Sequence, residues 1–302
     1  MVCIPEVFEM NPERESFNEK VVLPFETSIE LFVKREDVLH SEISGNKFRK
    51  LKYNLQEAKR LGFAKLLTFG GAYSNHIAAV AAAGKAFGFE TIGIIRGDEL
   101  VDKFMENETL KLAFENGMRF GFISRTAYRN KTSEDFLEQL KLKFGDFYLI
   151  PEGGTNAFAV KGCEEILTET DANFDYLCCA IGTGGTISGI VNSAFENQKV
   201  IGFPALKENF LQEEIPLFSN KSNWELIRDY HFGGYAKTTS ELIDFVNDFN
   251  QNQSFKIEPV YTGKMFYGLF DMMRNNYFKP NSKILAVHTG GLQGLNSKIL
   301  QK

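Results

Sequence analysis

The sequence has few cysteines and no long apolar segment. Its 302 residues include four cysteines, Cys3, Cys163, Cys178 and Cys179, with no Cys-x-x-Cys pair and no paired framework. This pattern indicates reduced, mostly buried thiols, and no His, Cys and acidic residues are spaced as in a metal site. The longest apolar stretches, such as IAAVAAAGKAF, fall well short of the ~20 residues that span a bilayer. The sequence therefore predicts neither a transmembrane helix nor a bound metal.

The sequence also lacks a strong excess of charge. The formal net charge is -5 and there is no long basic run, which argues against a nucleic-acid-binding protein and favours small molecules as partners. The N-terminal segment MVCIPEVFEMNPERE carries acidic residues where a signal peptide has a basic region and a long apolar core. We therefore expect a cytoplasmic protein.

Short β-rich runs alternate with helix-length segments along the chain. The runs are IELFVKRE, KLLTFGG, ETIGIIRG, MRFGFISR, DFYLIPEGG, FDYLCCAIGTGG, KVIGFPA and KILAVHTGG. Nearly continuous apolar strands separated by helices are typical of parallel sheets that are buried on both faces, so the predicted fold class is α/β. In open α/β sheets, ligands bind beyond the carboxyl ends of the strands, where many of these runs carry glycines.

The tetrad Ser44-Gly45-Asn46-Lys47 places a lysine at the start of a predicted helix. Gly45 and Asn46 favour a tight bend just before the helix-forming run FRKLKYNLQEAKRL. The positive end of the helix dipole disfavours the charged ammonium, which helps the amine to act as the nucleophile that a Schiff base requires. A solvated lysine in a basic helix is the alternative, and this residue alone does not decide between the two.

A second motif, Ile181 to Gly189, follows the run FDYLCCA and precedes a helical segment. Its glycines allow backbone N–H groups to converge on an anion, and its threonines add hydroxyl donors, so the motif predicts a phosphate-binding turn. It is neither a P-loop nor a dinucleotide fingerprint, because the glycines are not followed by Lys-Ser or Lys-Thr and the GxGxxG spacing is missing. A plain strand-to-helix turn is the alternative.

Three further motifs end runs or begin helices, and each is weak by itself. In GGAYSNH, Ser74 and Asn75 are suited to capping the following helix and equally to contacting a ligand. A lone histidine such as His76 is more often structural than a base. The others are EPVYTGK, with Tyr261, and HTGG, which closes the last run.

Six motifs in this order, SGNK, GGAYSNH, PEGGTN, GTGGT, EPVYTGK and HTGG, resemble those of the pyridoxal-phosphate enzymes of fold type II. The resemblance is specifically to the 1-aminocyclopropane-1-carboxylate deaminase and D-cysteine desulfhydrase family, and it covers most of the chain. It implies two three-layer α/β/α domains with mostly parallel sheets, the smaller inserted in the larger. The large domain would comprise residues 1–51 and 157–302, and the small domain residues 52–156. It also implies pyridoxal 5'-phosphate as cofactor, a small amino-acid substrate and a homodimer.

The resemblance implies roles for individual residues. Lys47 corresponds to the lysine that binds the cofactor as a Schiff base and moves the substrate's protons. Asn75 corresponds to the partner of the cofactor's phenolic oxygen, and Ser74 to a hydroxyl beside the substrate. Tyr261 corresponds to the tyrosine that stacks on the pyridine ring, and Tyr235 to a second active-site tyrosine. The residues of the phosphate grip are Thr183, Gly184, Gly185 and Thr186.

Other positions are assigned more loosely. His76 follows the Ser-Asn pair and is expected to line the substrate site. Lys50 occupies a basic position of the family, although a solvated helix face explains it more simply. The role of His288 is left open.

Thr262 decides the predicted reaction. Deaminases that open the cyclopropane ring carry a glutamate at this place, where it keeps the pyridine nitrogen protonated and the ring strongly electron-withdrawing. A threonine hydroxyl supplies no counter-charge. Expelling a carbanion needs that strong sink, whereas expelling a thiol, with a pKa of roughly 8.5, needs much less. The prediction is therefore α,β-elimination from D-cysteine to pyruvate, sulfide and ammonia. His76 also fits the desulfhydrase branch, since deaminases tend to carry glutamine there.

Three alternatives stay open at this point. The first is a 1-aminocyclopropane-1-carboxylate deaminase, which forms 2-oxobutanoate and ammonia. The second is a pyridoxal-phosphate-binding protein with little turnover. The third is an enzyme of the wider fold type that acts on L-amino acids.

Overall fold

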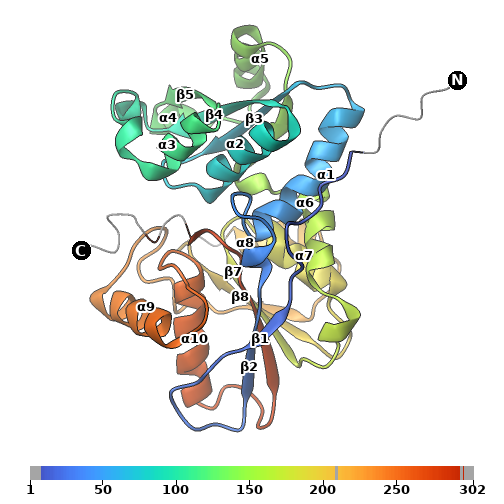
Figure 1. The fold of residues 1–302 in the computed structure, drawn as a ribbon, viewed down its shortest axis with the longest axis vertical. Coiled ribbons are helices and arrows are strands. Elements are labelled where there is room, and N and C mark those ends of the chain that lie inside the picture. The colour runs from blue at the N-terminus through green and yellow to red at the C-terminus, as the bar shows by residue number, and fades with distance from the viewer. Residues whose placement is uncertain (1–7, 208–209, 293–294, 296–302) are drawn as a thin grey trace, which may run out of the picture.

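The computed structural model describes residues 8–207, 210–292 and 295, which form two lobes, each built on one sheet (Figure 1). The four-stranded sheet of the upper lobe has the order β5-β4-β3-β6, and all of its neighbouring strands run parallel. Its strands are β3 (Lys65–Gly70), β4 (Glu90–Arg96), β5 (Arg119–Ile123) and β6 (Tyr148–Ile150).

The six-stranded sheet of the lower lobe has the order β1-β2-β10-β7-β8-β9. It is parallel except for β1, which pairs antiparallel with β2. Its strands come from both sides of the upper-lobe segment: β1 (Asn18–Lys20), β2 (Glu30–Lys34), β7 (Tyr176–Ile181), β8 (Lys199–Pro204), β9 (Trp224–Leu226) and β10 (Lys283–Val287). The eight predicted runs are confirmed as strands, while the three-residue strands β1 and β9 were not predicted.

Helices cover both faces of each sheet. In the upper lobe, these are α2 (Asn75–Phe87), α3 (Glu108–Glu115), α4 (Arg125–Tyr128) and α5 (Glu134–Phe144). Three helices, α1 (Asn46–Arg60), α6 (Ala157–Cys163) and α7 (Gly185–Ser193), pack together beside the junction of the lobes. The lower lobe also contains the helices α8 (Leu211–Glu214), α9 (Ser240–Asn252) and α10 (Thr262–Arg274).

Alternating strand residues enter different cores, which explains the three layers in each lobe. Leu66 packs with α1, α2 and α3, whereas its neighbour Leu67 packs with α4 and α5. In the lower lobe, Cys178 faces α9 and α10 and Cys179 faces α7. A strand that is buried on both faces must be apolar at successive positions, which is the pattern that the sequence shows. The predicted α/β fold with two three-layer units is confirmed.

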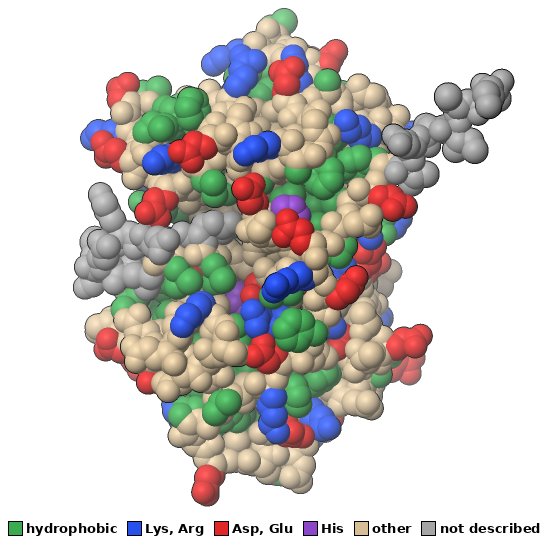
Figure 2. All heavy atoms as spheres, viewed as in Figure 1, with side chains coloured by type: hydrophobic (Ala, Val, Ile, Leu, Met, Phe, Trp, Pro, Cys, Tyr) green, Lys and Arg blue, Asp and Glu red, His purple; other side chains and the backbone are tan. Residues whose placement is uncertain are grey.

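The predicted domain boundaries stay a prediction. The helix α1 runs through the proposed boundary at residues 51 and 52. None of the helices within the described ranges has the length and apolar character needed to cross a bilayer. On the face shown in Figure 2, acidic and basic side chains are interspersed over both lobes.

Candidate active site

The bend before Lys47 requires a glycine. Gly45 has a φ of +62° and precedes α1, which begins at Asn46. A Cβ at Gly45 would lie 2.1 Å from the carbonyl oxygen of Thr289, so no other residue fits without moving the backbone. The backbone N–H of Asn46 donates to the same oxygen at 3.2 Å. The predicted bend and helix start are confirmed, and Lys47 lies on the first turn of α1.

The amine of Lys47 lies in an enclosed, electropositive position. Burial, together with the smaller effect of the nearby charge of Lys50, lowers the pKa of Lys47 to about 7. The Nζ atom contacts only the neutral Oδ1 of Asn46, at 3.1 Å, among the hydrogen-bond partners that the described residues offer. An amine with such a pKa is substantially uncharged near neutral pH, which is the state that attacks an aldehyde.

The predicted phosphate-binding turn is connected to the lysine helix through Asn46. The turn ends at Gly184, with a φ of +86°, and α7 begins at Gly185. The Nδ2 of Asn46 donates to Oγ1 of Thr186 at 2.8 Å, which links the turn to the lysine helix. The hydroxyl of Thr183 is 2.6 Å from that of Thr155, from the PEGGTN motif. The start of α7 therefore aims its positive dipole end into the space beside Lys47.

Lys50 corrects the sequence-based prediction of a solvated side chain. It is 2% exposed, and its Nζ donates to the carbonyl of Gly153 at 2.9 Å and to the hydroxyl of Thr155 at 3.2 Å. The hydroxyl of Thr183 lies 3.5 Å away. Burial lowers the pKa of Lys50. Its ammonium lies at the phosphate-binding turn because α1 packs this face against α6 and α7.

The start of α2 brings three predicted residues to the same space. Ser74 is the N-cap, and its Oγ accepts the backbone N–H of Ile77 at 3.4 Å, so its own proton stays available to a ligand. Asn75 is the first residue of the helix. Ser74 therefore caps α2 and also lines the cavity beside Lys47.

His76 is buried and its ring is bonded on one side. Its Nε2 lies 2.9 Å from Oγ1 of Thr68, whose proton is donated to the carbonyl of Ile150 at 2.8 Å. The hydroxyl has only one proton, so Nε2 of His76 must be the donor. Burial, then the charges of Lys47 and Lys50, hold the pKa of His76 well below its usual range, which makes a neutral ring.

The two tyrosines lie together, but Thr262 is turned away from the cavity. The rings of Tyr235 and Tyr261 meet edge to face with centroids 6.1 Å apart. Thr262 is fully buried, and its Oγ1 bonds the side chain of Glu258 at 3.2 Å and its backbone N–H at 3.0 Å. Its hydroxyl is engaged by Glu258 and the residue does not line the cavity, so the structure adds no support to the predicted cofactor contact of Thr262, which stays a prediction.

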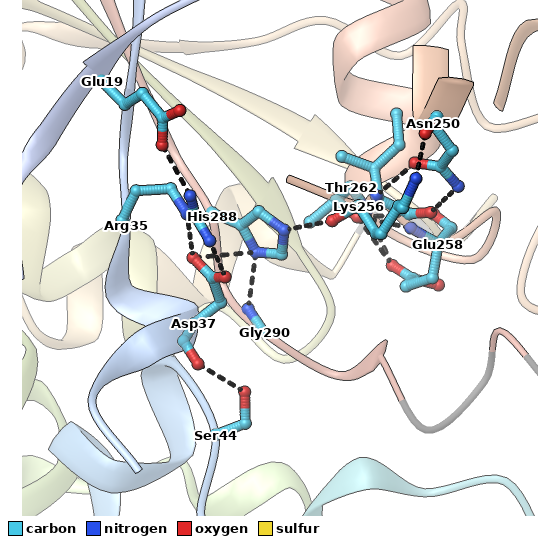
Figure 3. A network of polar contacts seen from close by, with 11 residues as sticks. Glu19, Arg35, Asp37, Ser44, Asn250, Lys256, Glu258, Thr262, His288 and Gly290 are labelled. Carbon is cyan, nitrogen blue, oxygen red and sulfur yellow. Dashed lines mark hydrogen bonds and ion pairs between the residues drawn. The ribbon is translucent and has the colours of Figure 1, made fainter. Parts of the chain in front are cut away.

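Glu258 is a buried carboxylate that accepts hydrogen bonds from nearby backbone N–H groups. It accepts the N–H groups of Val260, Tyr261 and Thr262 at 2.6–2.8 Å. Figure 3 shows Glu258 beside Thr262, the first residue of α10. Glu258 therefore caps α10 and also fixes Tyr261, which precedes the helix.

His288 follows the last strand, β10, and holds the turn whose residues Thr289 and Gly290 line the cavity (Figure 3). The Nε2 of His288 donates to the carbonyl of Lys256 at 2.7 Å, and its Nδ1 accepts the N–H of Gly290 at 3.1 Å. These two bonds require the neutral ring, and burial lowers the pKa of His288 accordingly. Asp37, which Arg35 holds in a bidentate pair, lies 3.9 Å from Nδ1. His288 thus shapes the turn at Gly290 and does not face the ligand space.

The cavity brings most of the predicted residues together. Lys47, Ser74, Asn75, His76, Tyr261, Thr183, Gly184 and Thr186 line it, while Tyr235, Gly185 and Thr262 do not. Sequence reasoning missed the lining residues Asn46, Lys50 and Thr289. The other described lining residues are Ser44, Ala79, Gly153, Ala180, Ile181, Gly182, Ile187, Gly290 and Gly291. No acidic side chain occurs among these described lining residues, so the cavity is positive.

The family model for the pyridoxal-phosphate dependent enzymes matches residues 23–290 of the chain. The chain belongs to this family. The match includes every residue that lines the cavity except Gly291. The predicted cofactor class, fold type and enzyme class are therefore confirmed.

Relatives of this pyridoxal-phosphate enzyme carry names from both predicted branches. A protein of Pyrococcus horikoshii, provisionally named as a 1-aminocyclopropane-1-carboxylate deaminase, is 30% identical over 89% of this chain and 86% of its own. The bifunctional D-cysteine desulfhydrase/1-aminocyclopropane-1-carboxylate deaminase of Arabidopsis thaliana, a mitochondrial protein, is 31% identical over 90% of this chain and 75% of its own.

Solved structures show the same fold. The crystal structure of an ACC deaminase homologue has a TM-score of 0.79 and 28% identity, and the match covers 93% of this chain and 95% of that one. A hydrogen sulfide-producing enzyme of Fusobacterium nucleatum has a TM-score of 0.67 at 16% identity, covering 92% and 96%, and is similar in fold alone.

The residues of the cavity fit pyridoxal phosphate. Lys50 is a buried cation with no carboxylate partner within the described part of the chain, and it lies beside the start of α7 and near Lys47. Buried charge without an ionic partner is costly, so the arrangement favours an anion such as a phosphate. Lys47 would hold the aldehyde carbon, and Tyr261 lines the same cavity.

Proposed function

We propose that this enzyme catalyses the α,β-elimination of D-cysteine. One D-cysteine and one water would give one pyruvate, one sulfide and one ammonia. The bound cofactor supplies an electron sink for the pair left when the α-proton departs. The family and the bifunctional plant relative support a reaction of this class, and the choice of substrate rests on the residues of the cavity.

The absence of an acidic side chain from the described cavity lining carries the choice of D-cysteine. A carboxylate beside the pyridine nitrogen would keep it protonated and strengthen the sink. Glu258 is the nearest acid in sequence to Tyr261, but its oxygens are occupied by three backbone N–H groups. A weaker sink suffices when the leaving group is a thiolate, which is far more stable than a carbanion. The choice of D-cysteine therefore rests on the lining of the cavity and no longer on Thr262.

The protein's own groups match the needs of the elimination. The amine of Lys47 has a pKa of about 7, so it can both accept and return a proton near neutral pH. Ser74 and Asn75 begin α2, and the free N–H groups of a helix start favour a carboxylate there, so we assign them to the substrate carboxylate. The neutral ring of His76 adds no competing charge.

Product analysis with three substrates tests the proposal. Purified enzyme with added cofactor is incubated with D-cysteine, L-cysteine or 1-aminocyclopropane-1-carboxylate, and pyruvate, sulfide and 2-oxobutanoate are each measured. We expect pyruvate and sulfide in equal amounts from D-cysteine, with the highest kcat/KM of the three. A higher kcat/KM for L-cysteine would contradict the assigned stereochemistry.

Deamination of 1-aminocyclopropane-1-carboxylate is the second candidate. The names of the Pyrococcus horikoshii and Arabidopsis thaliana relatives favour it. In the same assay, 2-oxobutanoate from this substrate together with no sulfide from D-cysteine would establish the deaminase and reject the desulfhydrase.

We also propose that the enzyme is a cytoplasmic homodimer. The family resemblance supports the dimer, and the four cysteines, which have no paired framework and are typical of a reducing compartment, support the location. Light scattering after size exclusion should give twice the mass of one chain, and a mass of one chain would reject the dimer.

A further inference from the structure

Lys264, on the first turns of α10, is a buried lysine that the active site does not use. It is 1% exposed, and its Nζ donates to the carbonyls of Gly234 at 2.7 Å, His231 at 2.8 Å and Ala205 at 3.4 Å. An ammonium has three donors, so these carbonyls occupy all of them. No acid within the described residues lies at ion-pair distance, and burial lowers the pKa of Lys264 to about 8. An apolar side chain would fill this space at lower cost, so the ammonium requires an explanation.

Two of the three carbonyls belong to a strained loop, which we call the Tyr235 loop, residues 230–236. Four of its residues have positive φ: Phe232 at +50°, Gly233 at +89°, Gly234 at +114° and Ala236 at +53°. Phe232 and Ala236 are not glycines, so their conformation is unfavourable by itself. Such a loop keeps its shape only where its surroundings hold it.

Two other contacts of the Tyr235 loop come from the same face of α10. The hydroxyl of Tyr230 donates to Asp271 at 2.7 Å, and the ring of Phe232 meets that of Tyr267 edge to face at 5.0 Å. Positions 264, 267 and 271 follow one another at helical spacings of three and four, so they form one stripe of the helix. Among these three residues of α10, only Lys264 forms hydrogen bonds with the backbone of the loop.

The loop holds Tyr235 against the tyrosine of the cavity. The rings of Tyr235 and Tyr261 are in edge-to-face contact, and Tyr261 comes directly before α10. One helix therefore fixes both tyrosines, Tyr261 through its capped start and Tyr235 through the ammonium of Lys264. We propose that Lys264 is a positioning residue that clamps the Tyr235 loop and so sets Tyr235 beside the active site. The inference uses the place of Tyr261 in the site and does not depend on which substrate is correct.

Hydrogen exchange of the loop tests the clamp without any substrate. The Lys264→Met variant keeps the length of the side chain and removes the ammonium. In the full chain loaded with cofactor, we expect amide exchange in residues 230–237 to rise by roughly ten-fold or more, as loss of a charged hydrogen bond implies. The matched control is Lys34→Met, since Lys34 is equally buried but pairs with Asp171 at 2.8 Å, far along the chain from the loop. We expect it to leave exchange in the loop unchanged.

Unchanged loop exchange in Lys264→Met, or an equal rise in Lys34→Met, would overturn the clamp. If Lys264→Met does not fold, Lys264→Gln, which retains two donors, should show a smaller rise confined to the loop. No rise in that variant would equally overturn the proposal.

A double-variant comparison tests whether Lys264 acts through Tyr235. The visible circular dichroism of the bound cofactor reports the asymmetry of its contacts. We expect Lys264→Met and Tyr235→Ala to change this signal in the same direction, and Lys264→Met to add nothing once Tyr235 is absent. Additive changes would show that Lys264 acts elsewhere. If these results hold while D-cysteine is not turned over, the proposed substrate fails and the clamp stands.

Discussion

Lys47 and Lys50 lie three residues apart on α1, and we propose a different task for each, nucleophile for Lys47 and phosphate-binding cation for Lys50. Both amines are buried near the same cavity, and their partners are neutral oxygens. Their charges repel, and the charge of Lys50 contributes to the lowered pKa of Lys47. A phosphate next to Lys50 would stabilise the charged form of that lysine, while Lys47 stays available as a neutral amine. The pair thus combines a binding cation with a nucleophile on one helical turn.

The first prediction concerns the pH dependence of Lys47. In cofactor-free protein, the rate of reaction with pyridoxal, which lacks the phosphate, should rise with pH, pass its half-maximum near pH 7 and level off above it, because the pKa of Lys47 is about 7. An ordinary lysine would continue to gain reactivity up to a pKa of about 10.4. Borohydride trapping and mass spectrometry locate the modified residue, and Lys47→Ala supplies the background of surface lysines. A Lys47 rate that still rises steeply above pH 9 would contradict the burial argument.

The second prediction concerns Lys50. The variant Lys50→Met should bind pyridoxal phosphate roughly 10- to 100-fold more weakly, as the loss of one charge-assisted hydrogen bond implies. Fluorescence titration of cofactor-free protein measures the affinity. The control is Lys52→Met, on the same helix, whose ammonium pairs with Glu165 at 2.7 Å. Equal affinities in wild type and Lys50→Met would remove Lys50 from the phosphate site.

Sequence reasoning predicted the position of Lys47 at the start of α1 but not the surroundings of Lys50 and Thr262, for one physical reason. Lys47 follows a bend that Gly45 dictates locally, so its place is encoded nearby. Lys50 is buried only because α6 and the turn at Thr183 pack over that face of α1. Thr262 turns away because Glu258 caps α10. The direction of a side chain depends on packing partners that are distant in sequence.

At the scale of elements, glycines set how closely the three central helices approach. A Cβ on Gly162 of α6 would lie 1.9 Å from the carbonyl oxygen of Arg49 on α1, and one on Gly189 of α7 would lie 2.5 Å from the Cβ of Cys163. The backbones of α1, α6 and α7 therefore touch directly. This contact sets the distance between the lysine helix and the helix that begins at the phosphate-binding turn.

The third prediction follows from this packing. The variant Gly162→Ala should lower the free energy of unfolding by about 1–3 kcal/mol, because the added methyl forces α6 away from α1. It should also weaken cofactor binding, since α1 carries Lys47 and Lys50. Urea unfolding and cofactor titration measure the two effects. The neighbouring exposed position provides the control, Lys161→Ala, which removes only a cation–π contact with Tyr53 and should lower stability by less than Gly162→Ala and leave cofactor affinity unchanged. A fully stable Gly162→Ala protein with normal affinity would show that the close approach is not required.

The elements themselves were largely predictable. Buried strands such as β3 and β7 have continuous apolar patterns because both of their faces are covered. The strands β1 and β9, at the edges of the six-stranded sheet, have three residues each, which is too short for a recognisable pattern. Their existence depends on pairing with neighbours and not on local composition.

At the scale of the whole molecule, the site forms where segments from both parts of the chain meet. Val287 pairs with both Lys34 and Cys179, so the carboxyl ends of β2 and β10 lie level and β7 continues past them to Ile181. The turn that follows β10 reaches α2, because a Cβ on Gly291 would lie 2.3 Å from Nδ2 of Asn75. A ligand in the cavity therefore contacts residues from the inserted segment and from the larger sheet. The order of motifs predicted this meeting, whereas the lining of the cavity required the structure.

The absorbance spectrum of the protein during addition of D-cysteine tests the central claim, that Lys47 holds the cofactor in a site built for D-cysteine. We predict that wild-type protein incubated with pyridoxal phosphate shows the visible band of a lysine-bound cofactor, that D-cysteine shifts this band while pyruvate accumulates, and that Lys47→Ala lacks the original band. A wild-type protein with no such band, or a Lys47→Ala protein with the same band, would contradict the assignment of Lys47. A wild-type band that D-cysteine leaves unchanged would contradict the proposed substrate.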